Sequence, residues 1–188
     1  VDLAGTANPD NELVANGQKY IGGTGDGAVC MAKGTLTITS PTPSFAIQKE
    51  ASNGDGVWVS PPGVAELEDN DSVGYFQLRW ANTGPSELKN PVVYDILPHK
   101  GDTGVIPGAG ERGSTTDALL VAEPDMPGDW TVHYSTSYNP CRPEMAEIPG
   151  CDDNWSSTAI WSEVKALRFT GPETVDSNYV ADFGLQVK

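Results

Sequence analysis

The sequence has no long apolar run and few basic residues. None of its 188 residues belongs to a stretch approaching the 18 consecutive apolar residues of a membrane-spanning helix. Its first residues also lack the basic, apolar and small-residue order of an export signal, so we expect any signal or anchor to lie outside this chain. Lys and Arg number 11 against 26 Asp and Glu, which gives a net charge of −15. This charge repels nucleic acid and anionic membranes, so neither is an expected partner.

The chain also lacks the residue patterns of common catalytic sites. It has two histidines, His99 and His133, and neither lies in a Ser/His/Asp or His-x-x-His context. Glycine-rich phosphate loops of the GxGxxG or GK[ST] type are absent from the sequence. We therefore expect that the protein is not an enzyme.

Cysteine is scarce, at three residues. Cys141 and Cys151 bracket the loop CRPEMAEIPGC, and we predict a disulfide there, worth roughly 2–3 kcal/mol by loop entropy. The alternative is two reduced thiols. A zinc site is not expected, because the spacing of the two cysteines does not suit zinc. Cys30 is left over, as a buried apolar side chain or a partner for a cysteine of another chain. A disulfide favours an oxidising, extracellular compartment.

An alternation of apolar and polar residues dominates what is present. Glycine (21) and proline (15) are spread throughout, which argues against long helices. The alternating stretches are 34–40, 44–51, 73–80, 91–97, 118–123, 129–137, 164–169 and 178–187. Short strands separated by turns predict an all-β fold, an antiparallel immunoglobulin-like β-sandwich with at most one or two short helical turns.

Turn and linker signals divide the chain further. Asn82-Thr83-Gly84-Pro85 predicts a turn, in which Gly84 is able to take a positive φ and Asn82 to bond its own backbone. SPTPS at 40–44 has the stiff, polar composition of a linker. We therefore predict an N-terminal strand segment at 1–39 and a β-sandwich at 45–188.

The N-terminal segment is too short to hold a core of its own, so it must pack on something. It either pairs within its own chain or donates a strand to the open edge of another copy, with Leu36 and Ile38 as the alternating apolar side chains. Strand exchange between copies that does not close on itself predicts a filament.

The sequence around the turn resembles a known family. Asn82-Thr83-Gly84-Pro85-Ser86, followed by a strand ending in Val93-Tyr94-Asp95-Ile96-Leu97-Pro98, resembles the "N-T-G-x-x … V-x-D-x-L-P" core of extracellular repeat domains on bacterial surface proteins. These immunoglobulin-like stalk modules are related to collagen-adhesin and pilin domains. Phe45-Ala46-Ile47-Gln48-Lys49 is similar to the family's opening strand, and Glu68 to Tyr75 to its second strand, although Asn70 replaces the usual Gly. The resemblance covers about residues 43–100, and residues 101–188 depart from it.

The resemblance implies a non-enzymatic, secreted module of a cell-surface adhesin or filament that serves cell adhesion. Its expected partners are other copies of itself or neighbouring repeats, and a host protein or glycan. Thr6-Ala7-Asn8 and Thr35 to Ser40 resemble the closing strands of a preceding repeat, which suits the strand-donor interpretation of the N-terminal segment.

Lys49 raises a question of buried charge. Alternation places it with Phe45 and Ile47, on the face that we expect to point into the core, where an unpaired ammonium costs several kcal/mol. In the related adhesin and pilin domains such a lysine forms an isopeptide bond, assisted by an acid, for which Asp95 is our candidate. The candidate electrophiles are Asn178, Asp182 and Asn8. The alternatives are an ion pair of Lys49 with Asp95 or a Glu, or a lysine that reaches the rim.

Calcium is the cofactor that the acidic turns suggest, because carboxylates on short turns are its preferred ligands. The candidate ligands are Asp55, Glu68, Asp69, Asp71, Asp152 and Asp153. The alternative is that these turns are solvated. Asp152-Asp153-Asn154 is also a candidate N-terminal cap for a helix of one or two turns within 155–164.

A recognition module is the rival function. Aromatic side chains in loops serve as stacking platforms for glycans or proteins. The candidates are Trp58, Trp130, Trp155 and Trp161. Burial of these side chains in the sandwich favours a structural module, whereas two or more exposed in one concave patch favour recognition.

Overall fold

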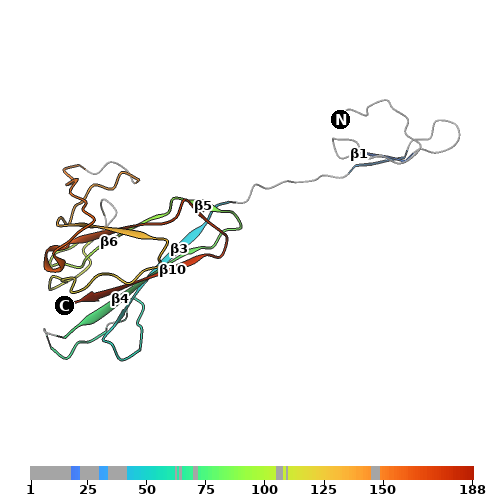
Figure 1. The fold of residues 1–188 in the computed structure, drawn as a ribbon. Helices are drawn as coiled ribbons and strands as arrows, with labels where there is room; N and C mark the ends of the chain where they lie inside the picture. Colours follow the sequence, from blue (N-terminus) through green and yellow to red (C-terminus); the bar gives the residue numbers. More distant parts are fainter. Residues whose placement is uncertain are drawn as a thin grey trace. The chain divides into compact units, whose positions relative to one another are not determined.

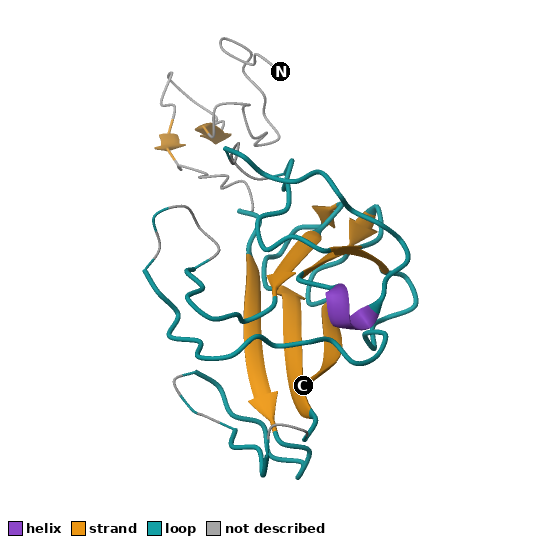
Figure 2. Cartoon of the chain, turned by 90° about the vertical axis from the view of Figure 1, so that its left-hand side faces the viewer, coloured by secondary structure: helices purple, strands orange, loops and turns teal. Residues whose placement is uncertain are grey.

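The computed structural model describes residues 18–21, 30–33, 42–61, 63, 65–69, 72–104, 108, 110–144 and 149–188. Within these residues the chain forms strands and loops, and every strand pairing is antiparallel. Figures 1 and 2 show the strands and the long loops that connect them. The predicted all-β sandwich class is confirmed.

The chain divides into two compact units, Val1–Ser40 and Pro41–Lys188. In the first unit the structure describes the hairpin of β1 (Gln18–Ile21) and β2 (Cys30–Lys33), which the alternation did not predict. The strand predicted at 34–40 lies outside the described residues, as does Asn8.

The first sheet of the second unit has the strand order β10-β4-β3. Its strands are β3 (Phe45–Ser52), β4 (Gly74–Asn82) and β10 (Val180–Val187). β4 lies in the centre and pairs antiparallel with each neighbour over eight residue pairs. β3 and β10 therefore run parallel to each other along the two edges of the sheet.

The second sheet has the order β6-β8-β7. Its strands are β6 (Val92–Ile96), β7 (Thr131–Ser135) and β8 (Ala166–Thr170). A short pair that the sequence did not predict, β5 (Leu88–Lys89) with β9 (Thr174–Val175), forms separately.

The two larger sheets face each other across an aromatic core. Phe183 of β10 is fully buried, and its ring centroid lies 4.4 Å from that of Phe169 on β8 and 4.9 Å from that of Trp130. Alternation explains this, because Ala181, Phe183 and Leu185 are buried while the residues between them are partly exposed. Each large apolar side chain so buried contributes about 1.5–3 kcal/mol.

The stretch 118–123 does not form the predicted continuous strand. Leu120 forms a β-bridge with Val187, and Asp125 forms one with Gly184. Between these two bridges the segment advances by five residues while β10 advances by three, so the segment bulges away from β10. Pro124 falls within this bulge and has no N–H to give to a ladder. The segment still runs along the outer edge of β10 and hydrogen-bonds to its backbone.

The turn after β4 is organised by a buried asparagine. Asn82 is 1% exposed; its Nδ2 donates to Ser86 O at 2.8 Å and to Asp176 O at 3.0 Å, while its Oδ1 accepts from Gly84 N at 3.1 Å. The predicted bond to its own turn is therefore confirmed. The expected positive φ of Gly84 is wrong. Glycine is needed there because an added Cβ would lie 2.8 Å from Ser44 N.

One 3-10 turn, Trp161–Glu163, is the helical element that the described residues contain. Its N-cap is Ile160, which makes no side-chain capping bond. The capping role predicted for Asp152, Asp153 and Asn154 is therefore wrong, because the turn begins several residues later.

Candidate functional site

An ion pair joins the two sheets through the core. Nζ of Lys49, on β3, lies 2.7 and 2.8 Å from the two carboxylate oxygens of Asp95, on β6. The Asp95 side chain is 8% exposed and that of Lys49 is 25% exposed. The Phe76 ring centroid lies 4.5 Å from Nζ, which adds a cation–π contact. Of the alternatives for Lys49, the ion pair with Asp95 is the one observed.

Two of the three candidate electrophiles lie far from Lys49. Asp182 pairs with Arg79 at 2.8 Å on the exposed face of the sheet, whereas Lys49 points to the opposite, inner face. Asn178 is exposed, and its N–H donates to Asn82 O at the end of β4. Asn82 lies opposite Phe45, four residues or about 13 Å along β3 from Lys49. Asp182 and Asn178 are therefore wrong candidates, and Asn8 is not described.

The inner face of β3 is not covered along its whole length. Phe45 and Ile47 share this face with Lys49, but they are 64% and 52% exposed. The Phe45 ring stacks on Trp80 at a centroid distance of 6.5 Å. The prediction that both side chains are buried is wrong, because β3 is an edge strand and the opposite sheet does not extend over its first residues.

The predicted disulfide between Cys141 and Cys151 is confirmed, with the two Cα atoms 4.8 Å apart. The loop that it closes is anchored on the second sheet. Nε1 of Trp155 donates to Cys141 O at 2.7 Å, and the Trp155 ring lies 5.7 Å from that of Tyr94 on β6. The loop is thus held by both a covalent bond and aromatic packing.

Glu144, within this loop, accepts hydrogen bonds from the Tyr94 hydroxyl and from Nη2 of Arg168. Burial and the bond to Glu144 raise the pKa of Tyr94 above its ordinary value. Burial alone would raise the pKa of Glu144, but the hydrogen bond from Tyr94 and the charge of Arg168 outweigh it, so that pKa is lowered. The cluster holds an ionised carboxylate against the outer face of the second sheet.

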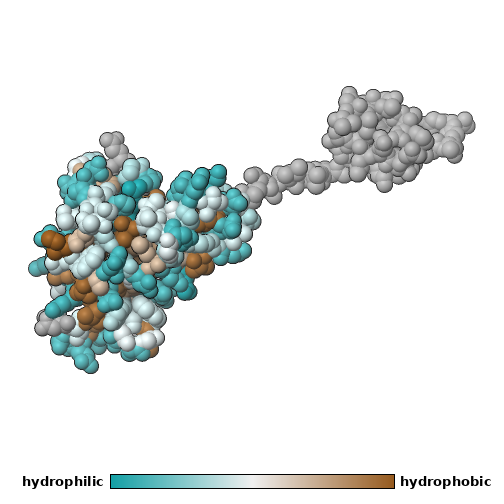
Figure 3. All heavy atoms as spheres, viewed as in Figure 1, coloured by the Kyte–Doolittle hydropathy of each residue, from teal (hydrophilic) through white to brown (hydrophobic). Residues whose placement is uncertain are grey.

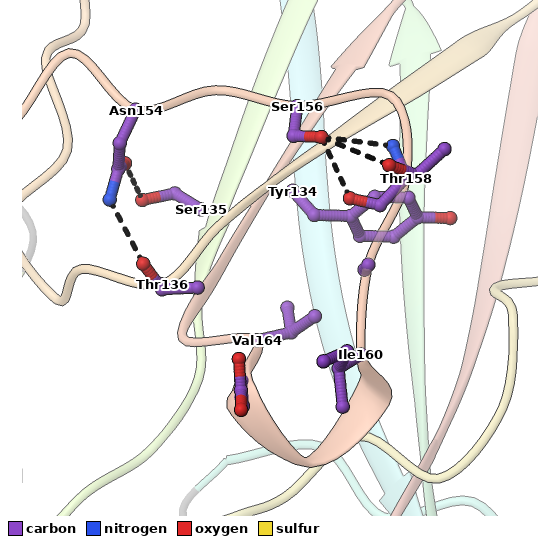
Figure 4. Close-up of a pocket in the computed structure, with 10 residues that line it drawn as sticks. Tyr134, Ser135, Thr136, Asn154, Ser156, Thr158, Ile160 and Val164 are labelled. Atoms are coloured by element: carbon purple, nitrogen blue, oxygen red, sulfur yellow. Dashed lines mark hydrogen bonds between the residues drawn. The ribbon is translucent and has the colours of Figure 1, made fainter.

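A pocket of about 370 Å³ with a mixed polar and apolar lining lies beside β7 (Figure 4). Its lining residues are Tyr134, Ser135, Thr136, Asn154, Ser156, Thr158, Ala159, Ile160, Glu163 and Val164. Nδ2 of Asn154 donates to Thr136 Oγ1 at 3.1 Å, and Oγ of Ser156 donates to Thr158 O at 2.8 Å. Hydroxyl and amide groups, which both donate and accept, lie there beside apolar side chains and the Glu163 carboxylate, so the lining suits a ligand that has both hydroxyl groups and an apolar face.

The four tryptophans do not form one exposed patch. Trp130 is 3% exposed, and its Nε1 donates to the Tyr179 hydroxyl at 2.9 Å. The prediction that Trp130 serves as a binding platform is therefore wrong. Trp155 and Trp161 are half-buried, and Trp161 packs edge-on against Tyr134. Trp58 alone among the four is exposed, at 41%.

Acidic turns that are separate in the sequence meet at one pocket of about 490 Å³. Asp55, Glu66 and Glu68 line it together with Tyr75. The sequence did not single out Glu66, because nothing in its spacing shows that the two turns converge. In the described part of the chain, no group of three or more His, Cys, Asp or Glu is placed to hold a metal ion.

The other calcium candidates are not among the residues that line this pocket in the described part of the chain. Asp69 accepts from the Ser72 hydroxyl at 2.9 Å, and Asp71 is outside the described residues. Asp152 and Asp153 are exposed near the disulfide, where Asp152 accepts from the Ser137 hydroxyl at 2.6 Å. Asp152 and Asp153 therefore do not join Asp55 and Glu68 in one site.

No helix among the described residues is long and apolar enough to cross a membrane. The chain matches no protein-family model, and no curated protein matches it in sequence.

Proposed function

We propose that residues 45–188 form a non-enzymatic structural module that transmits tension in an extracellular, cell-surface protein such as a bacterial adhesin or filament. The path of the chain through the first sheet is the observation that carries this proposal. The disulfide supports the extracellular setting, because disulfides persist in oxidising compartments.

The chain enters and leaves the sandwich at opposite ends of the first sheet. Phe45, the first residue of β3, lies opposite Asn82 at the end of β4. Val187, the last residue of β10, lies opposite Gly74 at the start of β4. Figure 1 shows the start of β3 and the C-terminus at opposite ends of the sheet. A pull on the two ends of the module therefore acts along the strands.

Such a pull loads two ladders in shear. It draws β3 and β10 in opposite directions past β4, and each of them pairs with β4 over eight residues. The hydrogen bonds of a ladder then resist together instead of breaking one pair at a time. Since each bond contributes about 0.5–1.5 kcal/mol, their simultaneous rupture presents a much higher barrier than sequential opening.

Side-chain contacts reinforce the same strands. The Lys49–Asp95 pair ties β3 to the second sheet, and the Arg79–Asp182 pair links β4 to β10. The disulfide does not join the strands that carry the pull, because it closes a loop between β7 and β8. Resistance in this module therefore depends on non-covalent contacts, which can re-form after rupture.

Single-molecule pulling of the full chain tests this proposal. Handles at the N- and C-termini load the ladders in shear, whereas handles at the N-terminus and at Asn178→Cys open them from the Phe45–Asn82 end. Both proteins carry Cys30→Ser, so that the handle cysteine is not in competition with it. We expect a several-fold higher rupture force in the first geometry. Equally low forces in both geometries would contradict a mechanical role.

The pocket of Figure 4, with its hydroxyl, amide and apolar side chains, favours a second candidate function, recognition of a glycan. Titration with a panel of neutral oligosaccharides should shift the amide resonances of Ser135, Ser156 and Thr158. Ser156→Ala removes one lining hydroxyl and should weaken the response. Shifts confined to other regions, or no shifts at all, would rule out this pocket as a glycan site.

A further inference from the structure

One arginine of the chain is buried without a counter-charge. Arg142 is 7% exposed, and its Nε atom has no hydrogen-bond partner. The other three arginines each bind a carboxylate, in the pairs Arg79–Asp182, Arg112–Asp102 and Arg168–Glu144. Among the described residues, no carboxylate lies within ion-pair distance of Arg142. A buried guanidinium is rarely left unpaired, because the loss of its hydration is costly.

The position of Arg142 is fixed by the residue before it. Cys141 forms the disulfide with Cys151, its N–H donates to Asp152 O at 3.0 Å, and its carbonyl accepts from Nε1 of Trp155 at 2.7 Å. These restraints act on the backbone next to Arg142, so they hold the start of its side chain in one place. A group that is already held in place loses little entropy when a ligand binds.

The charged groups around Arg142 leave a positive charge in excess. The charges that act on the Tyr94 hydroxyl are the Glu144 carboxylate and the guanidinium groups of Arg168 and Arg142. Glu144 already accepts hydrogen bonds from Tyr94 and Arg168. The cluster therefore has two cations and one anion, although the whole chain has a net charge of −15. This excess matches a ligand with a single negative charge.

Two donors of this cluster lack an acceptor. The Nε atoms of Arg142 and Arg168 are both buried and unpartnered. A buried N–H group in a native protein normally meets an oxygen atom, which belongs to the protein, a water molecule or a bound ion. A guanidinium is a planar fork of N–H donors, so it binds a carboxylate through parallel hydrogen bonds. The charge and the donors of the cluster are therefore those of a carboxylate site.

Two aromatic rings lie beside these groups. The ring centroids of Tyr94 and Trp155 are 5.7 Å apart, and both residues are half-buried. An aromatic ring with an accessible face is a platform for the apolar face of a sugar. In the view of Figure 3, hydrophobic residues of the described surface lie scattered among hydrophilic ones. A ligand with polar groups and a small apolar face therefore suits this surface better than an apolar one.

We infer that Arg142 anchors a binding site for the carboxylate of a small sugar acid, on the loop that the disulfide closes. The carboxylate accepts hydrogen bonds from the Arg142 guanidinium and supplies the missing negative charge, while the sugar ring lies against Trp155 or Tyr94. A polyanion does not fit, because the single excess cation does not offset its repulsion by a chain of net charge −15.

This site goes beyond the tension-bearing geometry and is separate from the pocket of Figure 4. The strands that carry the pull belong to the first sheet, whereas Tyr94 and Arg168 lie on β6 and β8 of the second. Neither Arg142 nor Trp155 is among the residues that line the pocket of Figure 4.

Titration of the full chain with glucuronate, at an ionic strength held constant with sodium chloride, tests the site. The indole Nε1–H resonance of Trp155 and the amide resonance of Arg142 should shift and saturate. Glucose, which has the ring but no carboxylate, should shift them little. Acetate should shift them less than glucuronate, and equal shifts would overturn the role of the rings. Sulfate that acts as strongly as glucuronate would overturn the preference for a carboxylate.

Variants of Arg142 separate binding from folding. Arg142→Met keeps an apolar stem and removes the unpaired charge, so the ligand-free variant should melt at a higher temperature than the wild type. Its affinity for glucuronate should fall by about tenfold or more. Arg142→Lys keeps the charge but not the planar fork, and its affinity should lie between those of the wild type and Arg142→Met. Arg79→Met is the matched control, because Arg79 is exposed on the first sheet, and it should bind like the wild type.

Two outcomes would overturn the inference. The first is a wild-type chain whose resonances respond to glucuronate no more than to sodium chloride. The second is a lower melting temperature of Arg142→Met that Glu147→Gln reproduces, which would identify Glu147, outside the described residues, as the counter-charge of Arg142. Neither outcome changes the expected rupture forces, so this inference and the structural function fail separately.

Discussion

Lys49 on β3 and Asp95 on β6 bind each other across the sandwich, with Nζ 2.7 and 2.8 Å from the two carboxylate oxygens. The pair connects residues that are 46 positions apart and lie in different sheets. Because Asp95 is almost fully buried, its negative charge depends on this one lysine for compensation in the described structure.

Removing the lysine should therefore cost more than losing a surface ion pair. Lys49→Met leaves Asp95 buried without a counter-charge and should lower the free energy of unfolding by about 2–4 kcal/mol. Lys49→Met with Asp95→Leu removes both charges and should recover most of that loss. Urea denaturation of the single and double variants measures the difference. A cost below about 0.5 kcal/mol for the single variant would make the pair equivalent to an exposed one.

The isopeptide bond that the family resemblance implies stays a prediction, and intact mass decides it. If Lys49 forms only the observed ion pair, the mass of the chain is lowered by about 2 Da alone, from the two hydrogens lost in the disulfide. An isopeptide bond between Lys49 and a carboxyl carbon releases water, and one to an amide carbon releases ammonia. The mass would then be lower by about a further 18 or 17 Da. Mass spectrometry of the denatured, non-reduced chain distinguishes the two results.

The disulfide should stabilise the loop without being needed for the fold. Cys141→Ser with Cys151→Ser should lower the free energy of unfolding by about 2–3 kcal/mol, because the unfolded loop gains freedom. The contacts of Trp155 and Glu144 remain and should keep the loop in place. Non-reducing peptide mapping should recover the bridged peptide. Recovery of both cysteines as alkylated free thiols would contradict the structure.

Calcium binding at the acidic turns also stays a prediction. A cation held by Asp55 and Glu68 would reduce the repulsion between the carboxylates of their shared pocket and stabilise the folded state by mass action. Calcium should then raise the melting temperature by several degrees, and EDTA should reverse the rise. Glu68→Gln should abolish the response, while Asp153→Asn at the distant loop should not. An unchanged melting temperature in calcium and in EDTA would contradict calcium binding and would mean that these carboxylates are simply solvated.

Stability should fall in acid through Glu144. Its pKa in the folded chain is lowered from the ordinary value of 4.5, against the effect of burial, by hydrogen bonds from Tyr94 and Arg168. The ionised Glu144 carboxylate therefore contributes to folding stability above about pH 4.5. This contribution is lost as the pH falls through the pKa of Glu144 in the folded chain. Since Glu144 is 38% exposed, the effect is small. Tyr94→Phe removes one donor, so it should flatten the dependence of unfolding free energy on pH between roughly 3 and 5.

Alternation along the chain was enough to predict six strands of the sandwich to within two residues at either end. It also placed Lys49 and Asp95 on inner faces, and loop composition identified the Cys141–Cys151 bridge. These features depend on residues close together in the sequence, because the period of a strand and the closure of a short loop are local properties.

Only the tertiary structure decided which of these residues are covered. Phe45 and Ile47 have the alternation of core residues, yet they remain exposed because β3 is an edge strand and the opposite sheet does not extend over its first residues. Trp130 is buried, although its position in the sequence suited an exposed platform. Asp55 and Glu68 line one pocket because two separate turns converge. The sequence by itself determined the strands, whereas burial and convergence depend on which distant element packs against each strand, and no local pattern encodes that.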